Sequence, residues 1–141
     1  MLEDSSLKYW HDAGHVARRA LEATREEVEP GKTWHEVIES AERFVRRNGG
    51  KPAFPATIAV NNLAAHYTTD HGLNAPENWE GEMIFKKGDL VKIDIGVHIN
   101  GHIGDNALTF EVGNSNNHSE QIKAAKESRD AAIEMLHPGT P

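Results

Sequence analysis

The stretch LVKIDIGVHINGHIGDNALTFEV, residues 90–112, decides the fold because it has the pattern of one β-hairpin. At its centre stands Asn100-Gly101, and this dipeptide suits a two-residue type I′ turn, in which both residues need positive φ. The turn fixes the register of the two strands. The pairs that follow are Ile99 with His102, Gly96 with Asp105, and Asp94 with Ala107.

The first strand of this hairpin has one apolar and one polar face. Its apolar residues are Val91, Ile93, Ile95, Val97 and Ile99, and they alternate with Lys92, Asp94, Gly96, His98 and Asn100. Such period-2 alternation predicts a strand with one face in a hydrophobic core. On the polar face, Gly96 is expected to leave room for an ion or substrate to approach.

Asp94 and Asp105 share the polar face on diagonal positions of the predicted pairing. Diagonal neighbours lie roughly 7–8 Å apart at Cα, and their side chains come closer. That separation suits two carboxylates that hold one ion or a pair of divalent ions about 3.5–4 Å apart. The alternative is an exposed hairpin whose acidic residues only keep it soluble.

Composition limits the chemistry that is available. The chain has 141 residues, no cysteine and a net charge of −7, with 38% hydrophobic residues. Without thiolates, any metal site must use Asp, Glu and His, which favours hard or borderline divalent ions. The negative charge argues against specific nucleic-acid binding. No apolar run is long enough for a membrane and no secretory signal is visible, so we expect a cytoplasmic protein.

Helical periodicity and capping signals predict three helices around the hairpin. The first runs from about Ser6 to Val28. The second starts after Thr33, which forms a capping-box pattern with Glu36, and ends near Asn48. The third is capped by Ser119 and continues to about Leu136. The apolar stripe of the first helix is Leu7, Trp10, Gly14, Ala17, Leu21, Thr24 and Val28; that of the second is Trp34, Val37, Ile38, Ala41, Phe44 and Val45.

The segments between these helices carry turn and strand signals. Pro52 and Pro55 fix an extended approach on either side of Phe54, and a short strand is expected over residues 57–60. Residues 71–81 are typical of a loop, because glycine, asparagine and proline are scattered through them. Lys87-Gly88-Asp89 is expected to turn the chain into the hairpin.

Three segments together resemble type 2 methionine aminopeptidases of the archaeal kind, which belong to the pita-bread-fold metallopeptidases. They are GGKPAFP (49–55), NNLAAHYT (61–68) and KIDIGVHINGHIGDNALT (92–109). The resemblance implies an α+β fold with an antiparallel sheet and flanking helices. Residues 1–141 would form the N-terminal half of a single catalytic domain, the first half of a creatinase/aminopeptidase-like fold.

The resemblance also implies roles for single residues. Asp94 and Asp105 match metal ligands, one chelating and one bridging, for two divalent ions of cobalt, manganese, iron or zinc. His66 matches the catalytic histidine that contacts substrate near the scissile bond. Phe54 is expected to line the pocket for the first side chain, and Asn62 to position backbone or substrate. His98 is expected to pack beside the site.

This sequence also departs from the family pattern. Thr69 stands where the family often has proline, which is expected to change loop rigidity. The family's other ligands, one histidine and two glutamates, come from the second half of the fold and have no match here. We therefore expect a truncated chain without peptidase activity of its own.

As part of a complete enzyme, the expected function is metal-dependent removal of the N-terminal methionine. The expected partners are nascent polypeptide N-termini, with the ribosome as a further candidate and no membrane. Two alternatives stay open: a non-catalytic pita-bread module that binds the ribosome or another protein, and an X-Pro dipeptidase on the same scaffold. A further possibility is that exposed strand edges pair two copies of the chain.

Overall fold

The computed structural model describes residues 4–69, 83–113 and 115–140, so the predicted loop at 71–81 lies outside the described residues. The helices are α1 (Asp4–Glu27), α2 (Trp34–Arg47) and α4 (Ser119–Glu134). The strands are β1 (Lys51–Pro52), β2 (Thr57–Val60), β3 (Leu90–Ile99) and β4 (His102–Glu111).

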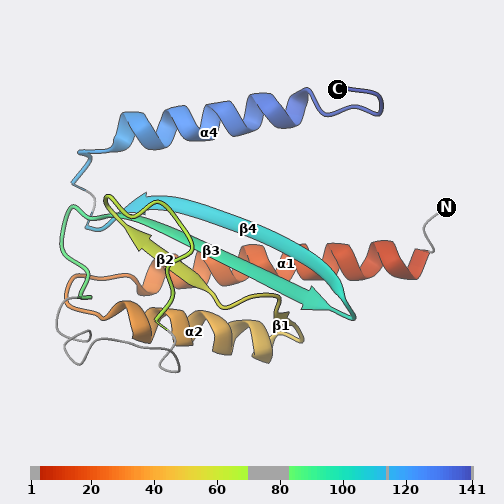
Figure 1. The fold of residues 1–141 in the computed structure, drawn as a ribbon, viewed down its shortest axis with the longest axis horizontal. Helices are drawn as coiled ribbons and strands as arrows, with labels where there is room; N and C mark the ends of the chain where they lie inside the picture. Colours follow the sequence, from red (N-terminus) through yellow and green to blue (C-terminus); the bar gives the residue numbers. More distant parts are fainter. Residues whose placement is uncertain (1–3, 70–82, 114, 141) are drawn as a thin grey trace.

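These strands form one antiparallel sheet with β3 at its centre. Strand β4 pairs along one edge of β3, and β1 and β2 pair one after the other along its opposite edge. Helices α1 and α2 pack on one face of this sheet, whereas α4 lies apart, beyond β4 (Figure 1). The fold is the predicted α+β arrangement of an antiparallel sheet with flanking helices.

The hairpin has the register that its turn predicts. Ile99 pairs with His102, Gly96 with Asp105 and Asp94 with Ala107. Asn100 and Gly101 adopt φ of 49° and 80°, as both residues of a type I′ turn must.

The apolar face of β3 lies in the core, as its alternation predicts. Val91, Ile93, Ile95 and Val97 are at most 2% exposed. Burying a side chain of this size contributes about 1.5–3 kcal/mol of transfer free energy. The opposite face of the hairpin, which carries both aspartates, is not covered by α1 or α2.

Helix α2 begins as its capping box predicts. The Glu36 amide donates to the Thr33 hydroxyl (3.2 Å), and the Thr33 amide donates to the Glu36 carboxylate (2.9 Å). Its predicted stripe is buried apart from Phe44, which packs against the core while partly exposed. At the other end Gly49, with φ of 84°, allows the chain to leave the helix in the left-handed region.

The predicted stripe of α1 is correct only in its second half. Leu7 and Trp10 are 43% and 42% exposed. The start of α1 extends past the tip of the hairpin (Figure 1), and the Trp10 ring meets the hairpin at His102, with ring centroids 5.3 Å apart. Further along, a Cβ on Gly104 would come within 2.5 Å of the Gly14 Cα. Helix and strand therefore pack backbone against backbone at this point.

The predicted cap of the last helix is wrong. Ser119 is already the first helical residue, and its hydroxyl donates to the Asn116 carbonyl at 3.3 Å. The N-cap is His118, which makes no side-chain cap bond. Helix α4 buries none of its residues. None of the helices described here is long and apolar enough to cross a membrane.

Candidate metal site

A hollow of about 350 Å³ opens on the uncovered face of the sheet, and we call it the aspartate hollow. It brings together side chains from β2, β3, β4 and the two connections that flank β2. The residues that line it are Phe54, Pro55, Thr57, His66, Thr68, Asp94 and Asp105. Four of the five predicted site residues, Phe54, His66 and the two aspartates, thus meet at one place.

Asp94 is held in the middle of the sheet, where Thr57 on β2 and Ala107 on β4 flank it. Its Oδ1 atom is buried and has no hydrogen-bond partner among the described residues. Burial raises the pKa of the Asp94 carboxyl, and the negative charge of Asp105 and a side-chain hydrogen bond to it raise the pKa further. Positive charge on His66 acts in the opposite direction. A bound cation would offset both the desolvation cost of the Asp94 carboxylate and its repulsion by Asp105.

His66 has an unusual backbone conformation. Its φ is 61°, in the left-handed region that a residue with a Cβ rarely adopts, and its side chain is exposed at the hollow. A non-glycine residue in this region costs on the order of 1–2 kcal/mol. Backbone strain of this kind is often retained where a side chain must point in a fixed direction. The functional role of His66 stays a prediction.

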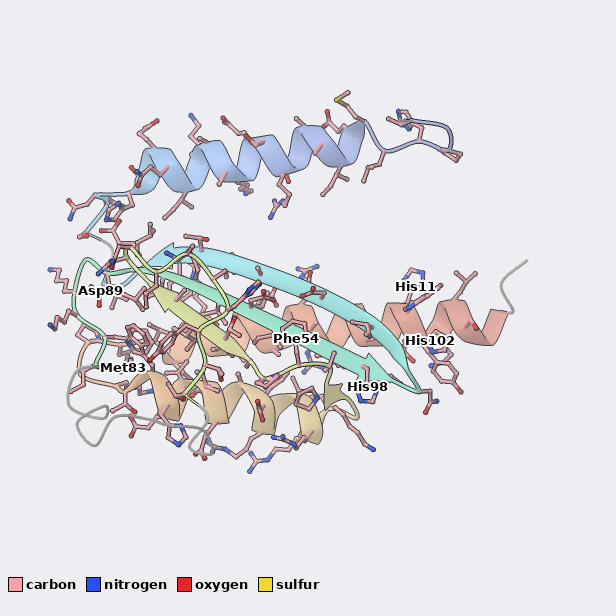
Figure 2. The ribbon with its side chains drawn as sticks, viewed as in Figure 1. His11, Phe54, Met83, Asp89, His98 and His102 are labelled. Atoms are coloured by element: carbon pink, nitrogen blue, oxygen red, sulfur yellow. The ribbon has the colours of Figure 1, made fainter. Side chains whose placement is uncertain are left out.

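Phe54 occupies the space that Gly96 leaves, which corrects the expected use of this glycine. A Cβ on residue 96 would lie 2.2 Å from Cε1 of the Phe54 ring. The ring therefore rests directly on the β3 backbone, over the middle of the hairpin (Figure 2). The space beside Gly96 is therefore filled by the Phe54 ring, which forms one side of the hollow, and not by an ion or a substrate.

Asn62 does not line the aspartate hollow; it is exposed. Its neighbour Asn61 makes hydrogen bonds instead: the side-chain Nδ2 donates to Oδ1 of Asp89 (2.9 Å), and the side-chain Oδ1 accepts from the Leu90 backbone N–H (2.9 Å). Asn61 thereby ties the end of β2 to the start of β3. A substrate role for Asn62 stays a prediction.

His98 lies on the polar face of β3 towards the turn, opposite Ile103 of β4 and outside the aspartate hollow (Figure 2). It is half-buried, and its buried Nδ1 has no hydrogen-bond partner among the described residues. This placement agrees with the expected packing role beside the site.

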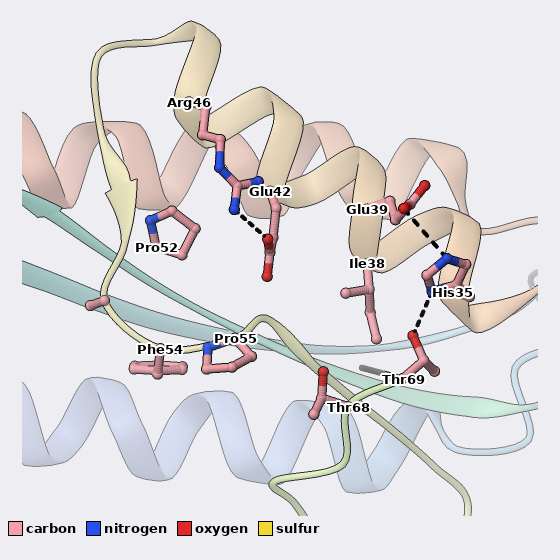
Figure 3. Close-up of a pocket in the computed structure, with 11 residues that line it drawn as sticks. His35, Ile38, Glu39, Glu42, Arg46, Pro52, Phe54, Pro55, Thr68 and Thr69 are labelled. Atoms are coloured by element: carbon pink, nitrogen blue, oxygen red, sulfur yellow. Dashed lines mark hydrogen bonds and ion pairs between the residues drawn. The ribbon is translucent and has the colours of Figure 1, made fainter. Parts of the chain in front are cut away.

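A second hollow, of about 560 Å³, lies on the other side of Phe54 against α2 (Figure 3). Phe54, Pro55 and Thr68 line both hollows, and this one adds His35, Glu39 and Glu42 from α2. Thr69 is buried there and its hydroxyl lies 3.0 Å from Nδ1 of His35. Thr69 therefore joins its loop to α2, a contact that proline at this position would not make.

Three residues that line the aspartate hollow, Pro55, Thr57 and Thr68, are not predicted as site residues from the sequence. Thr57 lies opposite Asp94, and Thr68 lines the hollow beside His66. The sequence predicts that Thr57 lies in a strand, but the partner of that strand depends on a pairing between distant segments. No local signal in the sequence gives that pairing.

The sequence model of metallopeptidase family M24 matches residues 8–141. The chain belongs to metallopeptidase family M24. Among curated members, the methionine aminopeptidase of Archaeoglobus fulgidus is 39% identical over 138 residues, which are 98% of this chain and 44% of that protein. The methionine aminopeptidase of Thermococcus onnurineus is 38% identical over 90% of this chain and 40% of its own length. The chain resembles the N-terminal half of archaeal methionine aminopeptidases.

Solved structures of M24 proteins share the fold. A methionine aminopeptidase from Thermotoga maritima superposes with a TM-score of 0.81 at 26% identity, over 96% of this chain and 54% of that one. A prolidase from Pyrococcus horikoshii superposes with a TM-score of 0.77 at 29% identity, over 95% of this chain and 37% of that one. The chain thus spans about two-fifths of the curated relatives' length and half or less of most structural neighbours.

As a member of a metallopeptidase family, the chain is expected to hold divalent metal, and the donors present fit that expectation in part. Asp94 and Asp105 are hard oxygen donors, and the partnerless Oδ1 of Asp94 suits a cation. Within the described residues, however, no group of three or more His, Asp or Glu side chains is placed to hold an ion. The described residues therefore provide only a partial ligand set.

Proposed function

We propose that residues 1–141 form one half of a single M24 catalytic domain that removes the N-terminal methionine from polypeptides. The observation that carries this proposal is the convergence of Asp94, Asp105 and His66 on one hollow of a chain that resembles methionine aminopeptidases. Two divalent ions, of cobalt, manganese, iron or zinc, would complete the site. The expected substrates are nascent chains in the cytoplasm, with the ribosome as a candidate contact.

Each side chain of the hollow has a distinct part in this proposal. Asp94 and Asp105 hold the cations, which supply electrostatic activation for the hydrolysis of a peptide bond when they are bound. His66 orients the substrate and donates a hydrogen bond to the carbonyl oxygen as negative charge develops there. Phe54 and Pro55 form an apolar wall for the first side chain of the substrate.

The partial ligand set predicts that the isolated chain releases no methionine. Two carboxylates leave most coordination positions of a divalent ion to water, and the described residues offer no third ligand group. The assay is methionine release from a Met-Ala-Ser peptide in the presence of Mn²⁺. Robust metal-dependent release by the purified chain alone would contradict the half-domain proposal.

A chimera tests the function directly. Residues 1–141 would replace the matching segment of the Archaeoglobus fulgidus methionine aminopeptidase, to which they are 39% identical. We expect the chimera to release methionine, and His66→Ala to lower kcat by about 10²–10³-fold, as removal of one donor to developing charge does elsewhere. His137→Ala, an exposed histidine after α4, is the matched control and should change little.

The X-Pro dipeptidase alternative is favoured by one observation, the similarity to prolidase structures. A second chimera would join the same residues to the remainder of the Pyrococcus horikoshii prolidase. Methionine release by the first chimera, with no Xaa-Pro cleavage by the second, supports the aminopeptidase. The reverse result supports the dipeptidase. If both chimeras fold but neither is active, the non-catalytic binding module is the better account.

A further inference from the structure

The loop that carries His66 is held at the residues that directly follow this histidine. The Tyr67 carbonyl accepts a hydrogen bond from the Ile58 amide of β2 at 2.8 Å. Thr68 lines the aspartate hollow, and Thr69 is only 5% exposed, so the chain passes from the hollow into the protein within two residues. The left-handed backbone of His66 can persist only where surrounding contacts hold it. The contacts of these following residues are therefore what keeps His66 in place.

The first two residues of α2 supply two of these contacts. Trp34 packs edge-on against the Tyr67 ring, with ring centroids 5.7 Å apart. Next to it, Nδ1 of His35 lies 3.0 Å from the Thr69 hydroxyl (Figure 3). The capping box fixes this start of α2, and the Trp34 amide donates to the Met83 carbonyl at 2.9 Å. A well-anchored helix start thus holds the loop at one apolar and one polar point.

The second nitrogen of His35 orients the ring. Nε2 lies 3.4 Å from a carboxylate oxygen of Glu39, one helical turn further on (Figure 3). Because an ionised carboxylate only accepts hydrogen bonds, Nε2 carries the proton of the neutral imidazole, and Nδ1 then accepts from the Thr69 hydroxyl. Thr69 is buried, and a buried hydroxyl that loses its partner is costly. The bond to His35 therefore fixes where Thr69 lies.

We propose that His35 is a positioning residue for His66. By holding Thr69 against α2, it keeps the loop in the conformation that presents the His66 side chain to the aspartate hollow. His35 itself lines the second hollow, beyond Phe54, and not the aspartate hollow, so it acts through the loop. The inference rests on the substrate-orienting role proposed above for His66, whereas the placement of the loop is tested without any activity.

Amide hydrogen exchange of the purified chain, followed by NMR, tests the placement of the loop. The Ile58 amide reports on the loop because it donates to Tyr67. The Ala59 amide is the matched control: neighbouring residues of a strand direct their N–H groups to opposite sides, and Ala59 pairs with Lys92 of β3. We expect His35→Ala to accelerate exchange of Ile58 by about tenfold and to leave Ala59 unchanged. Equal acceleration at both amides, or none at Ile58, overturns the proposal.

Variants of Thr69 separate the hydrogen bond from packing. Thr69→Val keeps the size of the side chain and removes the hydroxyl, so it should accelerate Ile58 exchange as His35→Ala does. Thr69→Ser keeps the hydroxyl and should restore the parent rate. Because both changes break the same bond, the double variant of His35→Ala with Thr69→Val should exchange no faster than either single variant. A Thr69→Ser chain that behaves like Thr69→Val contradicts the proposal.

The chimera with the Archaeoglobus fulgidus methionine aminopeptidase tests the consequence for catalysis. His35→Ala should lower kcat by about tenfold with little change in KM, because a small displacement of a group that acts on the transition state is costly. In a His66→Ala background it should have no further effect, and the exposed His137→Ala is again the control. A full effect of His35→Ala without His66 contradicts the proposal. An inactive parent chimera overturns the proposed function, while hydrogen exchange still decides whether His35 holds the loop.

Discussion

The ring of Phe54 lies where a side chain on residue 96 would have to be, with Cε1 only 2.2 Å from the position of an added Cβ. Gly96 and Phe54 are therefore coupled: the glycine on β3 fixes the position of the aromatic wall of the aspartate hollow. This relationship connects the stability of the sheet to the shape of the site.

Gly96→Ala should displace that ring and lower the free energy of unfolding. Overpacking of this kind typically costs about 1–3 kcal/mol, and we expect the lower end because the ring can move toward the uncovered face. Urea denaturation measures the change. The double variant with Phe54→Ala removes the clash, so the two changes should be strongly non-additive.

Gly14→Ala is the matched control for this prediction. A Cβ on Gly14 meets no atom within 4 Å, and alanine is favoured over glycine inside a helix. It should therefore stabilise the chain by about 0.5–1 kcal/mol. Equal effects of Gly96→Ala and Gly14→Ala would contradict the account of the Phe54 contact.

The raised pKa of Asp94 predicts how stability depends on pH. Its carboxyl binds protons more tightly in the folded than in the unfolded chain, chiefly through burial and then through Asp105. The metal-free chain should thus lose stability as pH rises from the ordinary aspartate value of 3.8 through the raised pKa, and the loss is complete above it. Solvent screens a half-buried carboxylate, so we expect at most ~1 kcal/mol.

Asp94→Asn should remove this pH-dependent loss. Urea denaturation of the metal-free chain across the acidic range is the measurement. Asp130→Asn, which removes a charge from exposed α4, should keep the pH profile of the parent. A profile that is unchanged by Asp94→Asn would mean that other groups cause the dependence.

The left-handed backbone of His66 predicts an unusual effect of glycine. His66→Gly should be more stable than His66→Ala by about 1 kcal/mol, because only glycine adopts a φ near the observed 61° without strain. Thermal unfolding of both variants gives the comparison. At Ala65, which does not have positive φ, glycine should not stabilise the chain. The opposite order at residue 66 would show that the backbone is not strained there.

Two hydroxyl residues at helix starts should behave differently. Thr33→Ala breaks the capping box of α2 and should cost about 1 kcal/mol. Ser119→Ala removes a hydroxyl that makes no cap bond, so the change in unfolding free energy should stay within a few tenths of a kcal/mol. Comparable losses in the two variants would contradict the assignment of His118 as the N-cap.

The sequence predicts features that depend on neighbouring residues. Asn100-Gly101 sets the register of ten residue pairs, which fixes the face shared by Asp94 and Asp105. Thr33 and Glu36 predict where α2 begins, because the two residues of the capping box lie within one helical turn of each other.

Features that depend on distant contacts were missed or misplaced. The pairing of Thr57 with Asp94 and the contact of Phe54 with Gly96 join segments that no local pattern connects. Leu7 and Trp10 follow the helical spacing of a core stripe but are 43% and 42% exposed, and Trp10 meets the hairpin only beside its turn, at His102. Helical periodicity predicts which side of a helix faces the core. It does not predict how far along the helix the sheet extends to cover that side.

The most direct test of the central claim is calorimetric titration of Mn²⁺ into the purified chain and into Asp94→Asn, Asp105→Asn and Asp130→Asn. A metal site built on the hairpin predicts binding to the parent chain and to Asp130→Asn, with loss of binding in each of the other two variants. Undiminished binding in both Asp94→Asn and Asp105→Asn would contradict a metal site at the aspartate hollow.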